Sequence, residues 1–185
     1  ETWFRSTHTD HVQTIFSAVD SSTVNHYLKL ELIEGGNLRW THNPTAGVTG
    51  TQITTVNPYS GFDEWGNGNW HHVACVFNDL EMTMYVDGFI VGQAEANGYI
   101  EDQAEIIIGK SAPLDHSNYY YGRLDDFRIW SIPRAWEDLR KHIDITLSGE
   151  EIGLAAYWKF DEVEGDIIFD LTQNDNDGEI CHIER

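Results

Sequence analysis

The sequence predicts an all-β protein, a two-sheet antiparallel β-sandwich with one short helix near residues 134–143. Short runs of alternating apolar and polar residues recur along the chain, and turn signals separate them about every 8–12 residues. Only one segment has the period of an amphipathic helix, whereas a parallel α/β fold needs a helix between most strands. With 185 residues, 41% of them hydrophobic, the chain can bury one core and needs no second.

The first part of the chain predicts three strands and then a long loop region. The strands are Thr14–Val19, His26–Ile33 and Leu38–His42. From Asn43 to Asn69 the composition shifts to Pro, Gly, Asn, Thr and Ser, which predicts loops with one strand near Gln52–Val56. Long loops on a rigid β scaffold are where binding sites usually lie.

The second part predicts strands almost throughout. They are His71–Phe77, Met82–Val86, Phe89–Ala94, Glu105–Ile108, Gly122–Trp130, Gly153–Phe160 and Ile167–Phe169. Asp87-Gly88 supplies a tight hairpin turn. The helix is expected at Arg134–His142, because Pro133 precedes it and Trp136, Leu139 and Ile143 are spaced to share one buried face.

The charge is strongly acidic, with 31 Asp and Glu against 11 Lys and Arg and a formal net charge of −20. Such a surface repels phosphate backbones and anionic membranes, so we expect no nucleic-acid partner. No apolar run approaches the roughly 18 residues that span a bilayer, so no membrane insertion is expected. Two explanations of the acidity stay open together: a solvated surface suited to salty surroundings, and oxygen ligands for calcium.

The chain has two cysteines, Cys75 and Cys181, which excludes a disulfide-dense scaffold. One bridge between them and two unpaired thiols are both compatible with the sequence. The chain opens on Glu1 without the pattern of a signal peptide, and it is expected to be an excised piece of a larger, multidomain protein.

Four motifs occur in a fixed order between Trp70 and Trp130: Trp70-His71-His72-Val73-Ala74, Val86-Asp87-Gly88, Ile106-Ile107-Ile108-Gly109 and Gly122-Arg123-Leu124-Asp125-Asp126-Phe127-Arg128-Ile129-Trp130. This order resembles the laminin G-like and pentraxin-like jelly rolls of the concanavalin A-like superfamily. The stretch from Gly153 to Glu162 extends the resemblance to about Gly178. The resemblance implies a jelly-roll domain over residues 1–178, with residues 179–185 as an edge strand or a linker to a neighbouring domain.

Alternation along the strands predicts which side chains fill the space between the sheets. Met82, Met84 and Val86 are expected in the core. Phe127 and Ile129 should face one way, with Asp126, Arg128 and Trp130 facing the other. Three tryptophans, Trp70, Trp130 and Trp158, are expected to pack in the core or on a sheet face rather than to bind a ligand.

Catalysis is not expected. Related glycoside hydrolases carry an E-x-D-x-x-E array on one strand, and the sequence contains none. Asp125 and Asp126 are adjacent on a strand, so their side chains diverge, and the same holds for His71 and His72. A G-x-S-x-G nucleophile turn and a zinc-type Cys-x-x-Cys pair are also missing from the sequence.

Calcium is the expected cofactor. The resemblance to pentraxin-like members implies ligands at Asn25 and, in the loop of residues 110–121, at Asp115. It also implies a separate structural ion at Asp125, for which a turn-capping carboxylate is an equal alternative. Residues 173–184 resemble an EF-hand loop only in part, because Gln173 stands where the first aspartate is required, so a turn is expected there.

Aromatic rings beside amides and carboxylates suit carbohydrate, because rings stack on the apolar faces of sugars. The candidate ligand-binding residues are Tyr59, Trp65, His116, Asn118 and Tyr119. Tyr121 belongs to the same run of three tyrosines beside Asp115 and Asn118, whereas Tyr120 is expected to pack on the sheet instead.

The sequence thus predicts a secreted or cell-surface recognition module that binds a glycan or an extracellular protein, with calcium as an expected requirement. A protein-interaction or spacer domain without a small ligand is the alternative, and a diverged glycoside hydrolase is a third hypothesis.

Overall fold

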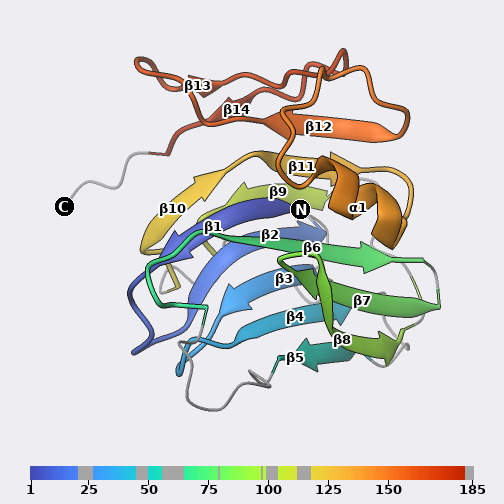
Figure 1. Ribbon diagram of the computed structural model, residues 1–185. Helices are drawn as coiled ribbons and strands as arrows, with labels where there is room; N and C mark the ends of the chain where they lie inside the picture. The colour runs from blue at the N-terminus through green and yellow to red at the C-terminus, as the bar shows by residue number, and fades with distance from the viewer. Residues whose placement is uncertain are drawn as a thin grey trace.

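The computed structural model describes residues 1–20, 27–44, 50–55, 65–78, 80–96, 98, 104–111 and 118–181. Within these residues the regular secondary structure is almost entirely β, and two five-stranded antiparallel sheets face each other (Figure 1). The predicted all-β sandwich is therefore confirmed. Asn25, Tyr59, Asp115 and His116, four of the predicted ligand residues, lie outside the described residues.

The first sheet has the strand order β10-β1-β6-β7-β8. Its strands are β10 (Gly122–Asp125), β1 (Thr2–Ser6), β6 (His71–Phe77), β7 (Glu81–Val86) and β8 (Phe89–Glu95). The second sheet has the order β5-β4-β3-β2-β9. Its strands are β5 (Thr51–Thr54), β4 (Leu38–Asn43), β3 (Tyr27–Leu32), β2 (Gln13–Asp20) and β9 (Ala104–Ile108). We call them the first and the second sheet below.

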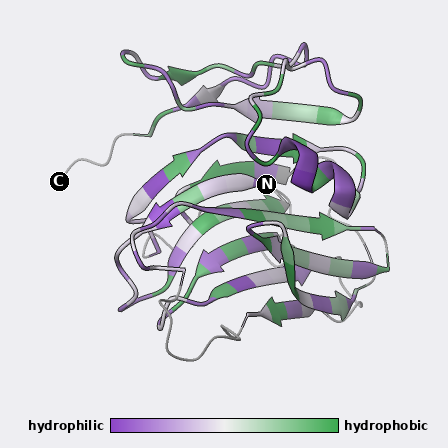
Figure 2. Cartoon of the chain, in the orientation of Figure 1, coloured by the Kyte–Doolittle hydropathy of each residue, from purple (hydrophilic) through white to green (hydrophobic). Residues whose placement is uncertain are grey.

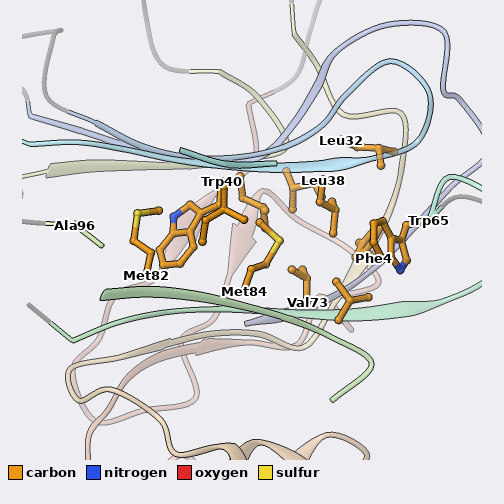
Figure 3. Close-up of a cluster of buried hydrophobic side chains, with 13 residues drawn as sticks. Phe4, Leu32, Leu38, Trp40, Trp65, Val73, Met82, Met84 and Ala96 are labelled. Carbon is orange, nitrogen blue, oxygen red and sulfur yellow. The ribbon is translucent and has the colours of Figure 1, made fainter. Parts of the chain in front are cut away.

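The core lies between the two sheets because every second residue of each strand points inward. The first sheet contributes Phe4, Val73, Met82, Met84 and Val86, and the second sheet contributes Leu30, Leu32, Leu38, Trp40 and Ile53. Figure 3 shows several of these side chains meeting between the sheets, and Figure 2 shows the alternation of apolar and polar residues along the strands. The predicted inward positions of β7 are thus confirmed.

The predicted strand Gly122–Trp130 is wrong in one respect, because it is two strands. β10 ends at Asp125 and β11 (Phe127–Trp130) begins after Asp126, whose φ of 49° lies in the left-handed region. β10 pairs with β1, whereas β11 pairs with β12 (Leu154–Trp158) in a separate two-stranded sheet. The chain therefore changes sheets at Asp126.

The C-terminal part forms a further layer, which consists of β11, β12 and the short pair β13 (Ile167–Ile168) and β14 (Gly178–Glu179) (Figure 1). Phe127 and Trp158 pack with Phe16 of β2, so this layer shares a hydrophobic cluster with the second sheet. On the other side of β11, the buried Arg128 lies 5.1 Å from the Tyr157 ring centroid. The predicted alternation of Phe127 and Arg128 is confirmed.

The helix α1 (Trp136–His142) begins two residues later than predicted. Leu139 packs on Ala74 and Tyr85, so α1 covers the outer face of the first sheet. Of the three residues predicted to form its buried face, only Leu139 is fully buried, and Trp136 is exposed. Trp136 instead donates a hydrogen bond from Nε1 to the Gly88 carbonyl (3.0 Å), which attaches the helix to the β7–β8 turn.

Trp70 corrects a second prediction, because 39% of its surface is exposed and it precedes β6 instead of packing within the sheet. Trp158 is buried as predicted. Cys75 and Cys181 are both free, which settles the open question of a bridge between them. No helix of the described chain is long and apolar enough to cross a bilayer.

Candidate functional site

Two loops meet at one end of the first sheet. Residues 7–12 connect β1 to β2, and residues 118–121 lead into β10, which pairs with β1. Gln13 is fully buried between them and binds both. Its Nε2 donates to the His8 carbonyl (2.5 Å), and its Oε1 accepts the Tyr121 amide hydrogen (2.8 Å). One buried amide thus fixes the two loops relative to each other.

Other hydrogen bonds support this arrangement. Ser6 Oγ donates to the Tyr121 carbonyl (2.7 Å), and the Thr14 amide donates to the Asn118 carbonyl (3.0 Å). A Cβ on Gly122 would lie 2.2 Å from the Arg5 carbonyl oxygen, so only glycine permits this close approach of the strands. The loop backbones are therefore held by the scaffold before any ligand arrives.

Three rings lie together on the surface of this end, and we call them the histidine–tyrosine cluster: His8, His11 and Tyr121. Tyr121 is 51% exposed, and its ring centroid lies 5.2 Å from that of His11 and 5.8 Å from that of His8. The His11 ring is nearly perpendicular to the tyrosine ring. The cluster therefore presents an aromatic surface with ring nitrogens beside it.

Asp10 adds a carboxylate to the cluster. Its Oδ1 lies 2.6 Å from Nδ1 of His11, and this hydrogen bond lowers the pKa of Asp10 below its ordinary value of 3.8. The acid is thus ionised near neutral pH and can accept hydrogen bonds from hydroxyl groups.

Two of the predicted ligand residues, Asn118 and Tyr119, lie three and two residues before Tyr121 in the described segment that leads into β10. The Tyr119 ring lies under the Lys110 ammonium, 5.7 Å from Nζ to the centroid. Asp115 and His116, which precede them in the same loop, lie outside the described residues. Tyr120 packs against the core, as predicted.

Trp65 is a correction. It was predicted to offer its ring to a sugar, but only 9% of it is exposed, and it packs in the core beside Phe4 (Figure 3). A ring whose faces contact other side chains cannot stack on a ligand. Tyr59, the other aromatic residue predicted in that loop, lies outside the described residues.

Asp125 does not join Asn118 and Tyr119. It stands at the other end of β10, about 13 Å along the strand from Tyr121 at the usual rise per residue. Its Oδ1 accepts the Asp126 amide hydrogen (2.9 Å), which is the capping role proposed as the alternative to a metal ligand. Burial and the charges of Asp126 and Asp161 raise the pKa of Asp125.

The described residues contain no group of three or more His, Cys, Asp or Glu side chains that could hold a metal ion. Asp125 therefore belongs to no such group among the described residues, and its role as a calcium ligand stays a prediction. Two of the three predicted metal ligands, Asn25 and Asp115, lie outside the described residues, so calcium stays a prediction.

The segment that resembles an EF-hand is a hydrogen-bonded turn, as expected. No helix flanks it within the described residues; β13 precedes it, and β14 lies within it. Asp170 organises it, because its carboxylate accepts the backbone N–H groups of Tyr157, Thr172 and Asn176. These bonds connect the turn to β12.

A separate cavity of about 680 Å³ lies between the sheets and below β11. Most of its lining is apolar and comes from both sheets. Its polar lining includes Arg128, which is already occupied by hydrogen bonds to the carbonyls of His142 (3.0 Å) and Ile145 (2.8 Å). Three buried atoms of its lining residues have no hydrogen-bond partner among the described residues: Glu1 Oε2, Arg128 Nε and Arg134 Nε. The histidine–tyrosine cluster is preferred for a sugar because it lies on the surface and carries an exposed aromatic ring.

The residues 1–140 match the family model described as the concanavalin A-like lectin/glucanases superfamily, Laminin_G_3. The chain belongs to this superfamily. The match covers both five-stranded sheets and all the residues of the histidine–tyrosine cluster.

Solved structures share the fold at low sequence identity. A candidate carbohydrate-binding protein from Bacteroides ovatus superposes with a TM-score of 0.71 and 18% identity over 95% of this chain, which spans about half (49%) of that protein. A heptameric SAP-like pentraxin from Limulus polyphemus superposes with a TM-score of 0.57 and 20% identity, and the match covers 75% of this chain and 65% of the pentraxin chain. The CBM40 of Ruminococcus gnavus IT-sialidase, bound to α2,6-sialyllactose, superposes with a TM-score of 0.51 and 14% identity. This match covers 66% of this chain and 69% of the CBM40 chain. None of the curated proteins matches this sequence.

The sequence interpretation missed His8 and His11, whereas Tyr121 lies in the tyrosine run that it had noted. The polar run Thr7-His8-Thr9-Asp10-His11 between two strands was the available signal, because loops on a rigid scaffold often carry binding residues. Its closeness to Tyr121 depends on the pairing of β1 with β10, which joins residues more than a hundred positions apart.

Proposed function

We propose that this chain is a non-catalytic carbohydrate-binding module and that the histidine–tyrosine cluster is its sugar-binding surface. The exposed ring of Tyr121, bracketed by His8 and His11 and held by Gln13, is the observation that supports it most. A tyrosine ring stacks on the apolar face of a sugar ring, and the imidazole nitrogens and the Asp10 carboxylate can bind its hydroxyl groups. Asn118 and Tyr119 extend the surface on one side.

The comparisons support the same class of function. The CBM40 domain is bound to a sialylated sugar, and the Bacteroides ovatus protein is a candidate carbohydrate-binding protein. Both share the fold with this chain at under 25% identity, so the ligand-binding residues are argued from this chain's own surface.

A binding role fits the carboxylates better than hydrolysis does. Retaining hydrolysis needs a second carboxylate about 5–5.5 Å from the first, and inverting hydrolysis needs one about 6.5–9.5 Å away. Asp10 is the one acid in the described loops 7–12 and 118–121, and the sequence lacks the E-x-D-x-x-E array of related hydrolases. The module is therefore proposed to hold a sugar without cleaving it.

Calcium and an extracellular location are part of the proposal. Asp115 and Asn25 are the expected ligands, with Asn118 nearby in the same loop as Asp115. An ion bound to the folded state raises the melting temperature, because the stabilisation grows with the logarithm of the ion concentration divided by its Kd. We therefore expect EDTA to lower the melting temperature and calcium to restore it. A melting temperature that stays the same in both would contradict bound calcium.

Tyr121→Ala tests the sugar site. A glycan array identifies a bound sugar, and calorimetry then compares the variants. Removal of a stacking ring should weaken binding by about fivefold or more, since such contacts are worth about 1 kcal/mol or more. Phe169→Ala is the matched control, because Phe169 is an equally exposed aromatic residue in the C-terminal layer. Equal losses in both variants, or none in Tyr121→Ala, would contradict the assignment.

A second candidate function, protein interaction, is favoured by the C-terminal layer. Val163 is 96% exposed, and Ile152 and Phe169 are also exposed there. A contiguous patch of exposed apolar side chains is typical of a surface that contacts another protein, so this function requires these side chains to act together. A blank glycan array together with a protein partner that Phe169→Ala no longer binds would favour this function over sugar binding.

A further inference from the structure

Two arginines lie directly opposite each other on neighbouring strands of the first sheet. Arg5 of β1 pairs in register with Arg123 of β10. Phe4 and Leu124, their neighbours in sequence, pack in the core, so both arginines stand on the outer face of the sheet. Both are exposed. Opposite residues on antiparallel strands have their Cβ atoms about 4.5–5.5 Å apart, so the two guanidinium groups can reach one point.

Neither arginine has a carboxylate within ion-pair distance among the described residues. Arg39 and Arg128, by contrast, each contact a glutamate or an aspartate. Like charges directly opposite each other destabilise a sheet. The chain has 31 acidic side chains, any of which could neutralise an arginine if it lay beside it. Two adjacent arginines without a carboxylate partner among the described residues are therefore an unusual concentration of positive charge on a chain of net charge −20.

The arginine pair adjoins the proposed sugar site. Arg123 follows Tyr121 by two residues, so their side chains lie on the same face of the chain, and Arg5 is diagonal to Tyr121 across the strand pair. On the far side the next residue of that face is Asp125, whose carboxylate accepts the Asp126 amide hydrogen. The face thus runs from the rings of the histidine–tyrosine cluster to two free guanidinium groups.

We propose that Arg5 and Arg123 together bind an anionic group, a carboxylate or a sulfate, on the saccharide held by the histidine–tyrosine cluster. Guanidinium groups bind both anions through paired N–H donors, and an anion between two arginines removes their mutual repulsion. The ligand class is therefore an acidic saccharide. This inference rests on the proposed function, because the same cluster supplies the stacking surface.

A glycan array with matched neutral, carboxylated and sulfated sugars tests the ligand class, with lactose and sialyllactose as one such pair. We expect the bound sugars to be acidic, and the carboxylated and sulfated members distinguish the two anions. Calorimetry on a bound sugar then compares Arg5→Gln, Arg123→Gln and the double variant. Each single change should weaken binding by about tenfold, and the double variant should also show a weaker dependence on salt concentration.

Lys29→Gln is the control, because it removes one positive charge from the outer face of the second sheet, on β3. It should leave binding unchanged, whereas a long-range charge effect would weaken binding equally in all variants and overturn the inference. Binding of neutral sugars only, or acidic binding that the arginine variants keep, would also overturn it while the proposed function stands. A blank array would overturn both.

Discussion

Gln13→Met separates the role of the buried clamp from general stability. Methionine has nearly the same shape as glutamine, so the core volume is kept while two hydrogen bonds are lost, those to the His8 carbonyl and from the Tyr121 amide. A net hydrogen bond contributes about 1 kcal/mol and an unsatisfied buried partner costs more, so we expect a loss of about 2–3 kcal/mol in the free energy of unfolding. For a domain of this size that lowers the melting temperature by about 5–10 °C.

Sugar binding should fall further than stability alone explains, because the clamp holds both loops of the histidine–tyrosine cluster. The assay is calorimetric titration at a temperature where each variant is fully folded, checked by circular dichroism. Met84→Ala is the control, since it removes a fully buried core side chain far from the loops at a cost of about 2–5 kcal/mol. If both variants bind equally well, or lose binding equally, the clamp has no specific role in the site.

Three further predictions concern stability and reactivity. Arg123→Glu should raise the melting temperature of the unliganded protein, because an opposite pair with Arg5 in place of a like pair is worth about 0.2–1 kcal/mol; a lower melting temperature would contradict the repulsion. Burial raises the pKa of Asp170, but its hydrogen bonds from backbone amides outweigh this and hold the pKa below 3.8. The stability that the Asp170 carboxylate contributes is therefore complete above pH 3.8 and is lost as the pH falls further. Asp170→Asn should lower the melting temperature at pH 7 and make the melting temperature depend less on pH below pH 4. An unchanged dependence on pH in the acid range would refute this. Burial raises the pKa of Cys75 to about 12, so mass spectrometry after iodoacetamide should find Cys181 modified in the native protein and Cys75 only after unfolding.

The strands were predictable because their cause is local. Alternation such as that of Met82, Met84 and Val86 shows directly which side chains face a core, and the structure confirms it. The break between β10 and β11 at Asp126 was not predictable. Aspartate tolerates a left-handed backbone, but the sequence does not show that it adopts one here. Only the pairing of β11 with β12 explains it.

The tryptophans show a second limit of prediction from sequence, which concerns the burial of large rings. Trp65 follows a loop-like stretch, which favoured an exposed ring, yet it fills the core beside Phe4. Trp70 opens a strand-like pattern, which favoured burial, yet it is exposed. Burial of a large ring near a strand end depends on which distant segment covers it, and the local pattern does not contain that information.

The candidate site was half predictable for the same reason. Asn118 and Tyr119 were predicted from the chemistry of one loop, and their contact with a ligand stays a prediction. His8 and His11 belong to another loop, and only the register of β1 against β10 brings them to Tyr121. Residue types can indicate a sugar surface within a segment, but a surface assembled from two segments requires the fold.

The change of sheets at Asp126 restricts what evolution can place there. The residue must accept a positive φ, and its carboxylate also accepts the hydroxyl hydrogen of Tyr157 from the neighbouring layer. Glycine satisfies the first demand and glutamate the second, while asparagine alone could replace it in both. Only aspartate and asparagine therefore fit this partly exposed position between two layers. Buried core positions are less restricted, because several apolar residues of similar volume are interchangeable there.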